Sequence, residues 1–215
     1  MEATARDKAP EPPAPPRTRI IACGALAREL LAIMKQPGLT HLSLTCLPAI
    51  WHNRPERIPD GVRGKIRQAR AEGIERILVA YADCGTGGLL DRVLEEEGVE
   101  RIDGPHCYAF FAGQARFEAL ADAEIGTFYL TDYLVRHFDR LMWQGLGLDR
   151  HPDLRDAYFG HYTKLVYLAQ IDDPALDAGA QEAAARLGLS YERISTGMGE
   201  LAGFVNRAVH HPKQG

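Results

Sequence analysis

The sequence predicts a Rossmann-like, three-layer α/β fold: a mostly parallel sheet with helices on both faces and a ligand site at the carboxyl edge of the strands. Two observations support this prediction. Short apolar segments alternate with amphipathic ones along most of the chain, which is typical of βαβ units. Residues 77–88, ILVAYADCGTGG, also place a glycine-rich turn between a buried strand and a helix. Parallel sheets present ligands at such turns.

Composition limits the class of protein. The 215 residues carry a net charge of −4, with 46% hydrophobic and 25% charged residues, as is ordinary for a globular chain. The slight acidity argues against a nucleic-acid partner, because nucleic-acid binders usually have a basic excess. No apolar run approaches the roughly 18 residues that span a membrane, and no secretory signal is evident. With four cysteines in ordinary α/β sequence, we expect reduced thiols and a cytoplasmic location.

The chain divides into a tail and one domain. Residues 1–17 hold five prolines among alanines and charged residues, which favours an extended, disordered segment. Residues 18–211 show no internal repeat and no clear boundary, so we expect a single α/β domain. Within it, the aromatic-rich helices over residues 132–163 are a candidate lid or dimer surface, and the dimer would be a homodimer.

The first half of the domain alternates strictly between strand and helix. Strands are expected at the short apolar runs 19–23, 42–47, 77–81 and 99–102. Helices are expected between them at 25–34, 62–72 and 89–97, where apolar residues recur at helical spacing. Gly73 and Gly98 end two of these helices. A stiff loop over residues 49–59, rich in proline, follows the second strand.

The second half continues the alternation. Strands are expected at 127–130, 165–169 and 191–194, and helices at 109–121, 133–143, 153–163, 175–187 and 200–209. Asp132 and Asp172-Asp173-Pro174 lie where N-caps are needed. Gly197 and Gly199 form a loop before the last helix.

Residues capable of chemistry follow the first five strands. At or beyond the strand ends lie, in chain order, Cys23, His52, Cys84, the pair His106 and Cys107, and Asp132. Because the carboxyl ends of parallel strands share one edge of a sheet, we expect these side chains to lie together. Cys46 lies inside the second strand, so we expect it to be a packing residue.

Three thiols and up to two imidazoles at one edge suit a soft or borderline metal, zinc first of all, with His106 as a ligand or a neighbour of the ligands. We predict that the metal ligands are Cys23, Cys84, Cys107 and His52. We further predict His106 and Asp132 as catalytic groups, and Gly24, Gly85, Gly87 and Gly88 as positions where backbone approaches a cofactor. Zinc would lower the pKa of a substrate thiol and present it as a nucleophile. An iron–sulfur cluster is the alternative for several thiolates.

Two interpretations without a metal remain open. In one, Cys84 or Cys107 is a nucleophile, with His106 or His52 as its base and the glycine-loop amides as oxyanion donors. In the other, the glycine turn is only a tight loop and its thiol is a small packed residue.

Five motifs, taken in order, resemble a known family. They are ACG at 22–24, HNRP at 52–55, YADCGTGG at 81–88, GPHCY at 104–108 and FYLTD at 128–132. Over residues 19–170 the chain resembles the prokaryotic family called domain of unknown function 1638. Members are often encoded beside corrinoid proteins, methyltransferases and corrinoid reactivators. Members also commonly have an acid between the His and the Cys of the fourth motif, whereas here Cys107 follows His106 directly.

The resemblance implies a role near cobalamin-dependent one-carbon transfer. The leading hypothesis is therefore a zinc-binding protein of methyl or one-carbon transfer that acts on a small-molecule substrate, with a methyltransferase component as the enzyme interpretation. The second hypothesis is a non-catalytic accessory protein that binds a corrinoid protein or its corrinoid cofactor. The third is a metal-free hydrolase or transferase with a Cys nucleophile.

Overall fold

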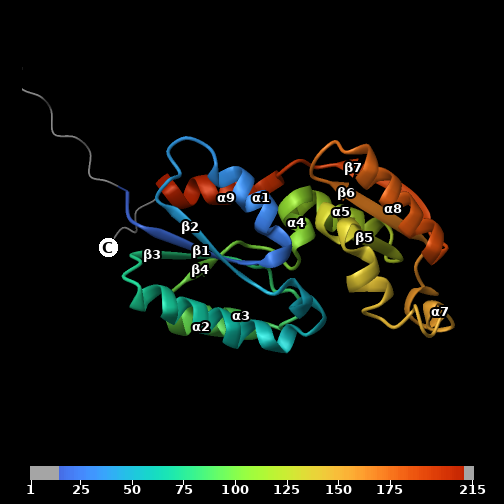
Figure 1. The fold of residues 1–215 in the computed structure, drawn as a ribbon, viewed down its shortest axis with the longest axis horizontal. Coiled ribbons are helices and arrows are strands. Elements are labelled where there is room, and N and C mark those ends of the chain that lie inside the picture. Colours follow the sequence, from blue (N-terminus) through green and yellow to red (C-terminus); the bar gives the residue numbers. More distant parts are fainter. Residues whose placement is uncertain (1–14, 211–215) are drawn as a thin grey trace, which may run out of the picture.

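The computed structural model describes residues 15–210, in which parallel strands and flanking helices form an α/β protein (Figure 1). The predicted fold class and the parallel strands are confirmed. Within these residues the strands form two sheets, which the alternation of strands and helices did not predict. The tail predicted over residues 1–17 lies almost entirely outside the described residues.

The seven strands of the described chain match the seven that were predicted. The first sheet has the order β2-β1-β3-β4 and the second the order β5-β6-β7. Their bounds are β1 (Thr18–Cys23), β2 (Leu42–Leu47), β3 (Arg76–Ala80), β4 (Glu100–Arg101), β5 (Thr127–Thr131), β6 (Lys164–Ala169) and β7 (Ser190–Ser195). After β1, the chain adds β2 on one side of β1 and then β3 on its other side. The topological switch point of the first sheet therefore lies between β1 and β3.

The helices that connect these strands depart from the prediction at several places. They are α1 (Ala27–Met34), α2 (Ile58–Ala71), α3 (Leu89–Glu97), α4 (Cys107–Ala112), α5 (Gln114–Ala123), α6 (Asp132–Arg136), α7 (Leu154–Phe159), α8 (Pro174–Leu187) and α9 (Gly199–His210). The helix expected at 109–121 is broken at Gly113, whose φ of +82° no helix accommodates. The helix expected at 133–143 stops at α6 and continues as a π-helical turn, Asp139–Trp143. Helix α2 starts earlier than expected, because Pro59 suits a first helical turn.

Each face of the first sheet packs against two helices, as the alternation of side chains along its strands requires. Ile20 and Ala22 of β1 belong to the cluster built with α1 and α9, whereas Ile21 belongs to the one built with α2 and α3. Figure 1 shows these two helical layers on opposite sides of the sheet. Burying each such large aliphatic side chain contributes about 1.5–3 kcal/mol.

The second sheet is covered in the same way. Tyr167 of β6 packs with α8, whereas Val166 and Leu168 face the cluster that contains Ala109 of α4 and Phe117 of α5. Helix α4 therefore lies between the two sheets, because Phe110 and Phe111 on its other side belong to the core of the first sheet.

The last helix returns to the first sheet. Leu201, Phe204 and Val205 of α9 pack in the same cluster as Leu26 and Leu30. The chain makes this crossing at Gly199, where φ is +49° and an added Cβ would collide with the carbonyl oxygens of α4. Helix α9, near the end of the chain, thus completes the core of the first sheet, which the beginning of the chain forms. A single domain over residues 18–211 stays a prediction.

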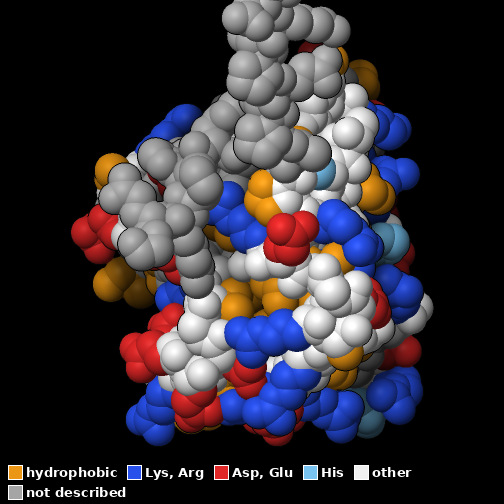
Figure 2. Space-filling view, turned by 90° about the vertical axis from the view of Figure 1, so that its left-hand side faces the viewer, with side chains coloured by type: hydrophobic (Ala, Val, Ile, Leu, Met, Phe, Trp, Pro, Cys, Tyr) orange, Lys and Arg blue, Asp and Glu red, His pale blue; other side chains and the backbone are white. Residues whose placement is uncertain are grey.

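The amino-terminal edge of the first sheet carries a charged hollow of about 270 Å³. Figure 2 shows this side of the molecule, with acidic and basic side chains around apolar ones. Lining the hollow are Arg70, Glu75, Arg76 and Glu100, together with apolar residues that include Ile74 and Ile77.

Candidate functional site

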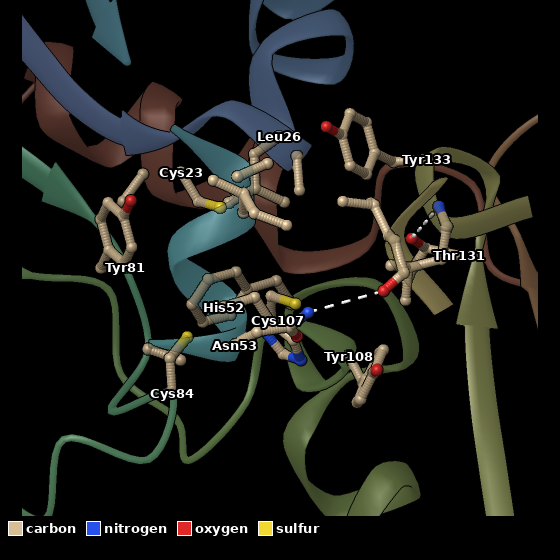
Figure 3. A pocket seen from close by; sticks show the side chains of 18 of the residues that line it. Cys23, Leu26, His52, Asn53, Tyr81, Cys84, Cys107, Tyr108, Thr131 and Tyr133 are labelled. Carbon is tan, nitrogen blue, oxygen red and sulfur yellow. Dashed lines mark hydrogen bonds between the residues drawn. The ribbon is translucent and has the colours of Figure 1, made fainter. Parts of the chain in front are cut away.

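A small cavity lies at the switch point, just beyond the carboxyl ends of β1 and β3 (Figure 3). The first sheet and its loops supply one wall. The opposite wall comes from Thr131 at the end of β5, from Tyr133 and Leu134 of α6, and from Leu141 and Met142 of the π-helical turn. The cavity has a volume of about 40 Å³ and an almost entirely apolar surface. Open α/β sheets bind ligands at this position.

Four of the predicted site residues meet at this cavity. Cys23 is the last residue of β1, Cys84 follows β3, Cys107 begins α4, and His52 belongs to a 3₁₀ turn, Ala49–Asn53, after β2. Figure 3 shows the three thiols around one space, with His52 beside them. This is the juxtaposition that the strand ends predicted, and its use as a metal site stays a prediction.

Cys84 has the only positive φ among the non-glycine residues of the described chain, at +50°. Its backbone N–H donates to the carbonyl of Pro105 at 3.1 Å, and that of Asp83 donates to Gly104 at 3.3 Å. These bonds hold the turn after β3 against the turn that carries Cys107. A strained residue that its surroundings fix in this way is a frequent feature of functional sites.

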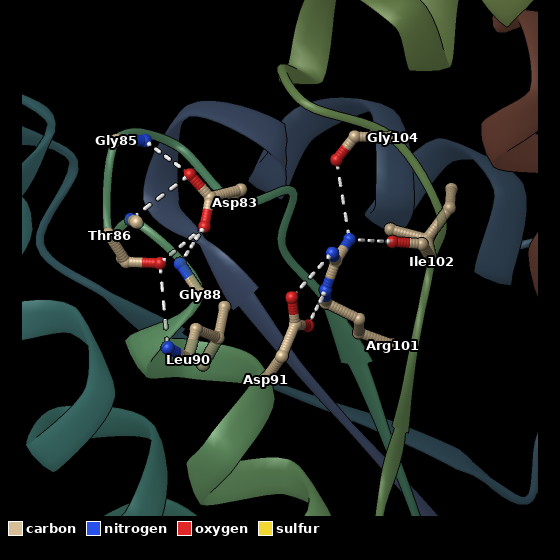
Figure 4. Close-up of polar contacts among 10 residues, drawn as sticks. Asp83, Gly85, Thr86, Gly88, Leu90, Asp91, Arg101, Ile102 and Gly104 are labelled. Atoms are coloured by element: carbon tan, nitrogen blue, oxygen red, sulfur yellow. Dashed lines mark hydrogen bonds and ion pairs between the residues drawn. The ribbon is translucent and has the colours of Figure 1, made fainter.

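The glycine turn is held by Asp83 (Figure 4). Its carboxylate accepts the N–H groups of Gly85, Gly87 and Gly88 at 3.2, 3.3 and 2.9 Å, and the Thr86 hydroxyl at 2.7 Å. Desolvation alone would raise the pKa of Asp83, but these hydrogen bonds together lower it. The amides predicted to approach a cofactor are therefore already occupied within the loop.

Gly24, the fourth predicted cofactor position, begins the 3₁₀ turn Gly24–Leu26 after β1 and packs closely on backbone. A Cβ at this position would lie 3.0 Å from the Leu47 carbonyl oxygen. None of the four predicted glycines is among the described residues that line the cavity. Their glycine character is explained by turn geometry and backbone packing, and their contact with a cofactor stays a prediction.

Arg101 fixes the second turn, as Figure 4 also shows. Its guanidinium makes a two-bond contact with the Asp91 carboxylate of α3, at 2.6 and 3.2 Å. It also donates to the carbonyls of Ile102 and Gly104, at 2.9 and 3.3 Å. The loop that leads to Cys107 is thus tied to the helix that follows Cys84.

Burial keeps the groups around the cavity uncharged. Desolvation raises the pKa of Cys84 to about 12, and it also raises the pKa values of Cys23 and Cys107. The nearby Cys23 thiol raises the pKa values of Cys84 and Cys107 further. Desolvation also lowers the pKa of His52, helped by the charge of nearby His106. Near pH 7 the cavity therefore presents three neutral thiols and a neutral imidazole.

Tyr81 is a cavity residue that the sequence reasoning missed. It is 2% exposed, and its hydroxyl is buried without a hydrogen-bond partner among the described residues. The hydroxyl lies beside the Cys23 thiol, where it lowers the pKa of that thiol. A thiol is only a weak acceptor, so the hydroxyl can still donate to a stronger acceptor. The available signal was a hydroxyl at the end of an apolar strand, directly before the glycine turn.

The two predicted catalytic residues lie apart from the cavity lining. Asp132 is 1% exposed at the end of β5, in the second sheet. Its Oδ1 accepts the Tyr167 hydroxyl at 2.7 Å and the Gln170 N–H at 3.0 Å, its own N–H donates to the Gln170 side chain at 2.7 Å, and Arg136 lies 3.8 Å from Oδ2. We expected Asp132 to lie at the same edge as the cysteines. It does not, because β5, the strand that precedes it, belongs to the second sheet.

His106 is exposed, and its ring lies near aromatic rings of α4 and α5. The ring centroid lies 6.3 Å from that of Tyr108 and 6.3 Å from that of Phe117. It is absent from the described cavity lining, although its charge influences the pKa of His52. Its catalytic role stays a prediction.

The donor types around the cavity suit zinc, but their arrangement does not yet form a coordination site. Within residues 15–210, no group of three or more His, Cys, Asp or Glu residues is placed so that it could hold a metal ion. Ligation by all three thiols would require the sulfur atoms to draw together. A corrin ring is many times larger than this cavity, so a corrinoid cofactor does not fit inside it as it stands.

The segment predicted as a lid or dimer surface, residues 132–163, forms the far wall of the cavity. Leu141 and Met142 come from its π-helical turn. The Asn53 side chain donates to the Leu141 carbonyl at 3.5 Å, which joins the two halves beside the cavity. The lid and the homodimer both stay predictions.

The fold and the cavity define an α/β protein with two parallel sheets and a thiol-lined cavity at the switch point of the first. The chain belongs to the family described as "Protein of unknown function (DUF1638)", whose match covers residues 46–205. The matched region contains His52, Cys84, Cys107 and Asp132, whereas Cys23 precedes it. Neither the curated proteins nor the solved structures gave a match. Among the described helices, none has the length and apolar character to cross a membrane.

Proposed function

We propose that this protein is a metal-dependent component of methyl or one-carbon transfer and that its chemistry takes place in the thiol-lined cavity. The observation that carries the proposal is the meeting of Cys23, Cys84, Cys107 and His52, from four separate strand ends, at one apolar cavity. The link to corrinoid-dependent methyl transfer comes from the family resemblance. Four free cysteines in the described chain fit a cytoplasmic protein, which is part of the proposal.

The metal we propose is zinc, and Cys23, Cys84, Cys107 and His52 would hold it. Soft thiolates and a neutral imidazole are its usual ligands, and a bound zinc ion supplies Lewis acidity and activates a thiol or water. The residues of the chain do the rest. The bonds of Cys84 to Pro105 hold two of the thiols at adjacent turns, and the apolar walls exclude water. Asp83 fixes the turn from which Cys84 projects.

The electrostatics favour metal binding over a metal-free nucleophile. A catalytic thiol needs a pKa lowered towards neutrality, because the thiolate is the reactive form. Here burial raises the pKa of Cys84 to about 12, and it also raises the pKa of Cys107 above its usual value. A cation at the cavity would reverse that shift, because it stabilises the thiolate form directly. The strained φ of Cys84 agrees with either function.

The first test is zinc stoichiometry in matched cysteine variants of the full chain. Cys84→Ser replaces a cavity thiol with a hard hydroxyl, and we expect the zinc content to fall from about one per chain to near zero. Cys46→Ser is the control, because Cys46 packs against the core next to β1 and does not line the cavity. A Cys84→Ser protein that keeps its full zinc content would refute the proposal.

The second test counts the protons released when zinc is added to metal-depleted protein. Each neutral thiol that becomes a ligand releases one proton. Because the pKa values of all three cavity thiols are raised, we expect about three protons per zinc in weak buffer near pH 7.5. Zinc held by exposed imidazoles or carboxylates would release almost none. Fewer than two protons per zinc would exclude the three-thiol site.

A further inference from the structure

The cavity lining carries no formal charge. Its described residues include no Lys, Arg, Asp or Glu, although 25% of the whole chain is charged. The hollow at the opposite edge of the same sheet, by contrast, is lined by Arg70, Glu75, Arg76 and Glu100. In the metal-free protein, a ligand with a formal charge would lose its hydration in the cavity without gaining a counter-charge from the chain, which is strongly unfavourable. The lining therefore selects against carboxylates and phosphates.

Among the polar side chains of the same lining, the Tyr81 hydroxyl is the one that is buried and without a hydrogen-bond partner in the described chain. The Tyr81 hydroxyl is buried, has no partner in the described part of the chain, and lies on the cavity wall (Figure 3). Buried hydroxyls almost always have a partner, because an unmade hydrogen bond is costly. The missing partner is therefore best supplied by an acceptor atom on a bound ligand.

Volume sets the size of that ligand. One water molecule needs roughly 10–15 Å³ of such space, and the cavity offers about 40 Å³. It therefore holds about three or four non-hydrogen atoms without rearrangement. Apolar side chains, among them Leu26, Phe110 and Met142, make up most of the wall, so the remainder of the ligand has to be apolar.

We propose that the cavity binds an uncharged, mostly apolar molecule of about four non-hydrogen atoms, whose single acceptor atom receives a hydrogen bond from Tyr81. Short alcohols, ketones and thioethers belong to this class. This inference names the substrate class of the proposed function and rests on it, because it takes the cavity as the functional site. Tyr81 is then a binding residue that decides which molecules enter.

A pair of isosteric probes tests the charge and the acceptor together. Acetone and acetate have the same number of non-hydrogen atoms and nearly the same shape, but only acetate is charged. The reporter is the ¹³C-labelled methyl group of Met142, which lies on the cavity wall. The methyl of Met34, packed in the core of the first sheet, is the internal control. We expect acetone to shift the Met142 signal saturably and acetate to bind at least 100-fold more weakly.

Two tyrosine variants then test the hydrogen bond. Tyr81→Phe removes only the hydroxyl, and we expect acetone to bind about 5- to 10-fold more weakly. Tyr129→Phe is the matched control, because the Tyr129 hydroxyl is also buried without a partner but lies outside the cavity. We expect the Tm to be unchanged or raised in both variants, since each loses an unsatisfied buried group.

Three outcomes would overturn the inference: acetate binding as tightly as acetone, no saturable effect of acetone on Met142, or equal acetone affinity in Tyr81→Phe and the wild type. A clear fall in the Tm of Tyr81→Phe would also count against it, because the hydroxyl would then have a structural partner. The titrations are made on the full chain as purified and after chelation, with zinc measured in each sample. Suppose that the purified protein contains no zinc, still binds acetone more tightly than acetate, and loses acetone affinity in Tyr81→Phe. That result would refute the metal proposal and support this inference.

Discussion

At the carboxyl edge of the first sheet, the thiols of Cys23 and Cys84 face an apolar cavity, whereas at the edge of the second sheet the Asp132 carboxylate is surrounded by donors. Both edges arise from the same parallel architecture, and both carry polar groups at strand ends. The first edge leaves a buried hydroxyl without a partner, that of Tyr81, while the second satisfies its carboxylate with Tyr167 and Gln170. Satisfied polar groups stabilise a fold, and unsatisfied groups on a cavity are available to a ligand.

The comparison predicts that the second edge matters most for stability. Asp132→Ala removes the acceptor of the Tyr167 hydroxyl and of the Gln170 N–H, and leaves Arg136 without its partner. We expect the free energy of unfolding to fall by about 3 kcal/mol or more. Urea denaturation of the full chain measures this change.

Two further variants make the Asp132 experiment specific. Asp132→Asn keeps an oxygen acceptor and is expected to cost clearly less than the alanine variant. Asp172→Ala removes a side chain that is 98% exposed and pairs with Arg193 at 3.0 Å, and it is expected to change stability by at most about 0.5 kcal/mol. If Asp132→Ala were as mild as Asp172→Ala, the hydrogen-bond network of the second edge would not be structural. Its predicted catalytic role would then regain support.

At the first edge, we expect the buried Cys84 thiol to make the free energy of unfolding fall at alkaline pH. The folded pKa of Cys84 is raised to about 12 from its usual 9.0, so folding favours the neutral thiol. Below pH 9 that stability is fully present. As the pH rises from about 9 towards 12, the unfolded chain loses the proton while the folded chain keeps it. The free energy of unfolding of the metal-free protein then falls by about 1.4 kcal/mol per pH unit for each such thiol.

Urea midpoints between pH 8 and pH 10.5, compared with those of Cys84→Ala, isolate the contribution of this thiol. The variant should show the shallower decline, because tyrosines and lysines titrate in both proteins. Equal slopes would mean that the Cys84 thiol is better solvated than its burial suggests, and the contrast between the two edges would weaken.

Much of this arrangement could be predicted from sequence because its signals are local. Apolar runs identified all seven strands, and the residues that follow them identified the three cavity thiols and His52. The order of the strands is not local. The division into two sheets depends on contacts between distant segments, and it moved Asp132 from the expected edge to another one.

Other features escaped the sequence for related reasons. The break at Gly113 was hidden because apolar residues continue on both sides of it. The unpaired hydroxyl of Tyr81 depends on what surrounds it after folding, which no spacing encodes. The glycines after Cys84 suggested a cofactor loop, but Asp83, whose carboxylate occupies their amides, stands directly before that cysteine in the sequence. An Asp followed by glycines is a signal for a self-capped turn that could have been read.

Glu29 of α1 is an exception to this comparison. It is a buried carboxyl group in the half of the chain that forms the first sheet, and it interacts with the charge of Asp132 in the other half. It is 4% exposed, and its Oε2 lacks a partner among the described residues. Desolvation, followed by the negative charge of Asp132, raises its pKa, against the opposing effect of Arg136. Folding therefore favours the neutral acid, and this stability is lost as the pH rises from about 4.5 through the folded pKa.

Glu29→Gln, which cannot ionise, tests that assignment. We expect the variant to gain about 1 kcal/mol over the wild type at pH 7 and to lose this advantage near pH 4. The measurement is the urea midpoint of both proteins across this range. A variant less stable than the wild type at pH 7 would show that the Glu29 carboxylate is ionised and paired, which would place a second satisfied network at the boundary between the two halves.

The smallest expected effect concerns the bond that joins the two edges. Asn53 donates to the Leu141 carbonyl at 3.5 Å, which is long for a hydrogen bond, and Asn53 is exposed. We expect Asn53→Ala to lower the free energy of unfolding by no more than about 0.5 kcal/mol. The bond nevertheless links the turn that carries His52 to the wall formed by Leu141, so its loss should free the cavity rim. Zinc should then leave about two- to threefold faster in chelator-competition kinetics, since 0.5 kcal/mol corresponds to about that factor. Asn206→Ala, on the exposed side of α9, is the control and should change neither quantity. An unchanged release rate in Asn53→Ala would mean that the far wall holds its place by apolar packing alone, and the two edges would then meet without any polar link beside the cavity.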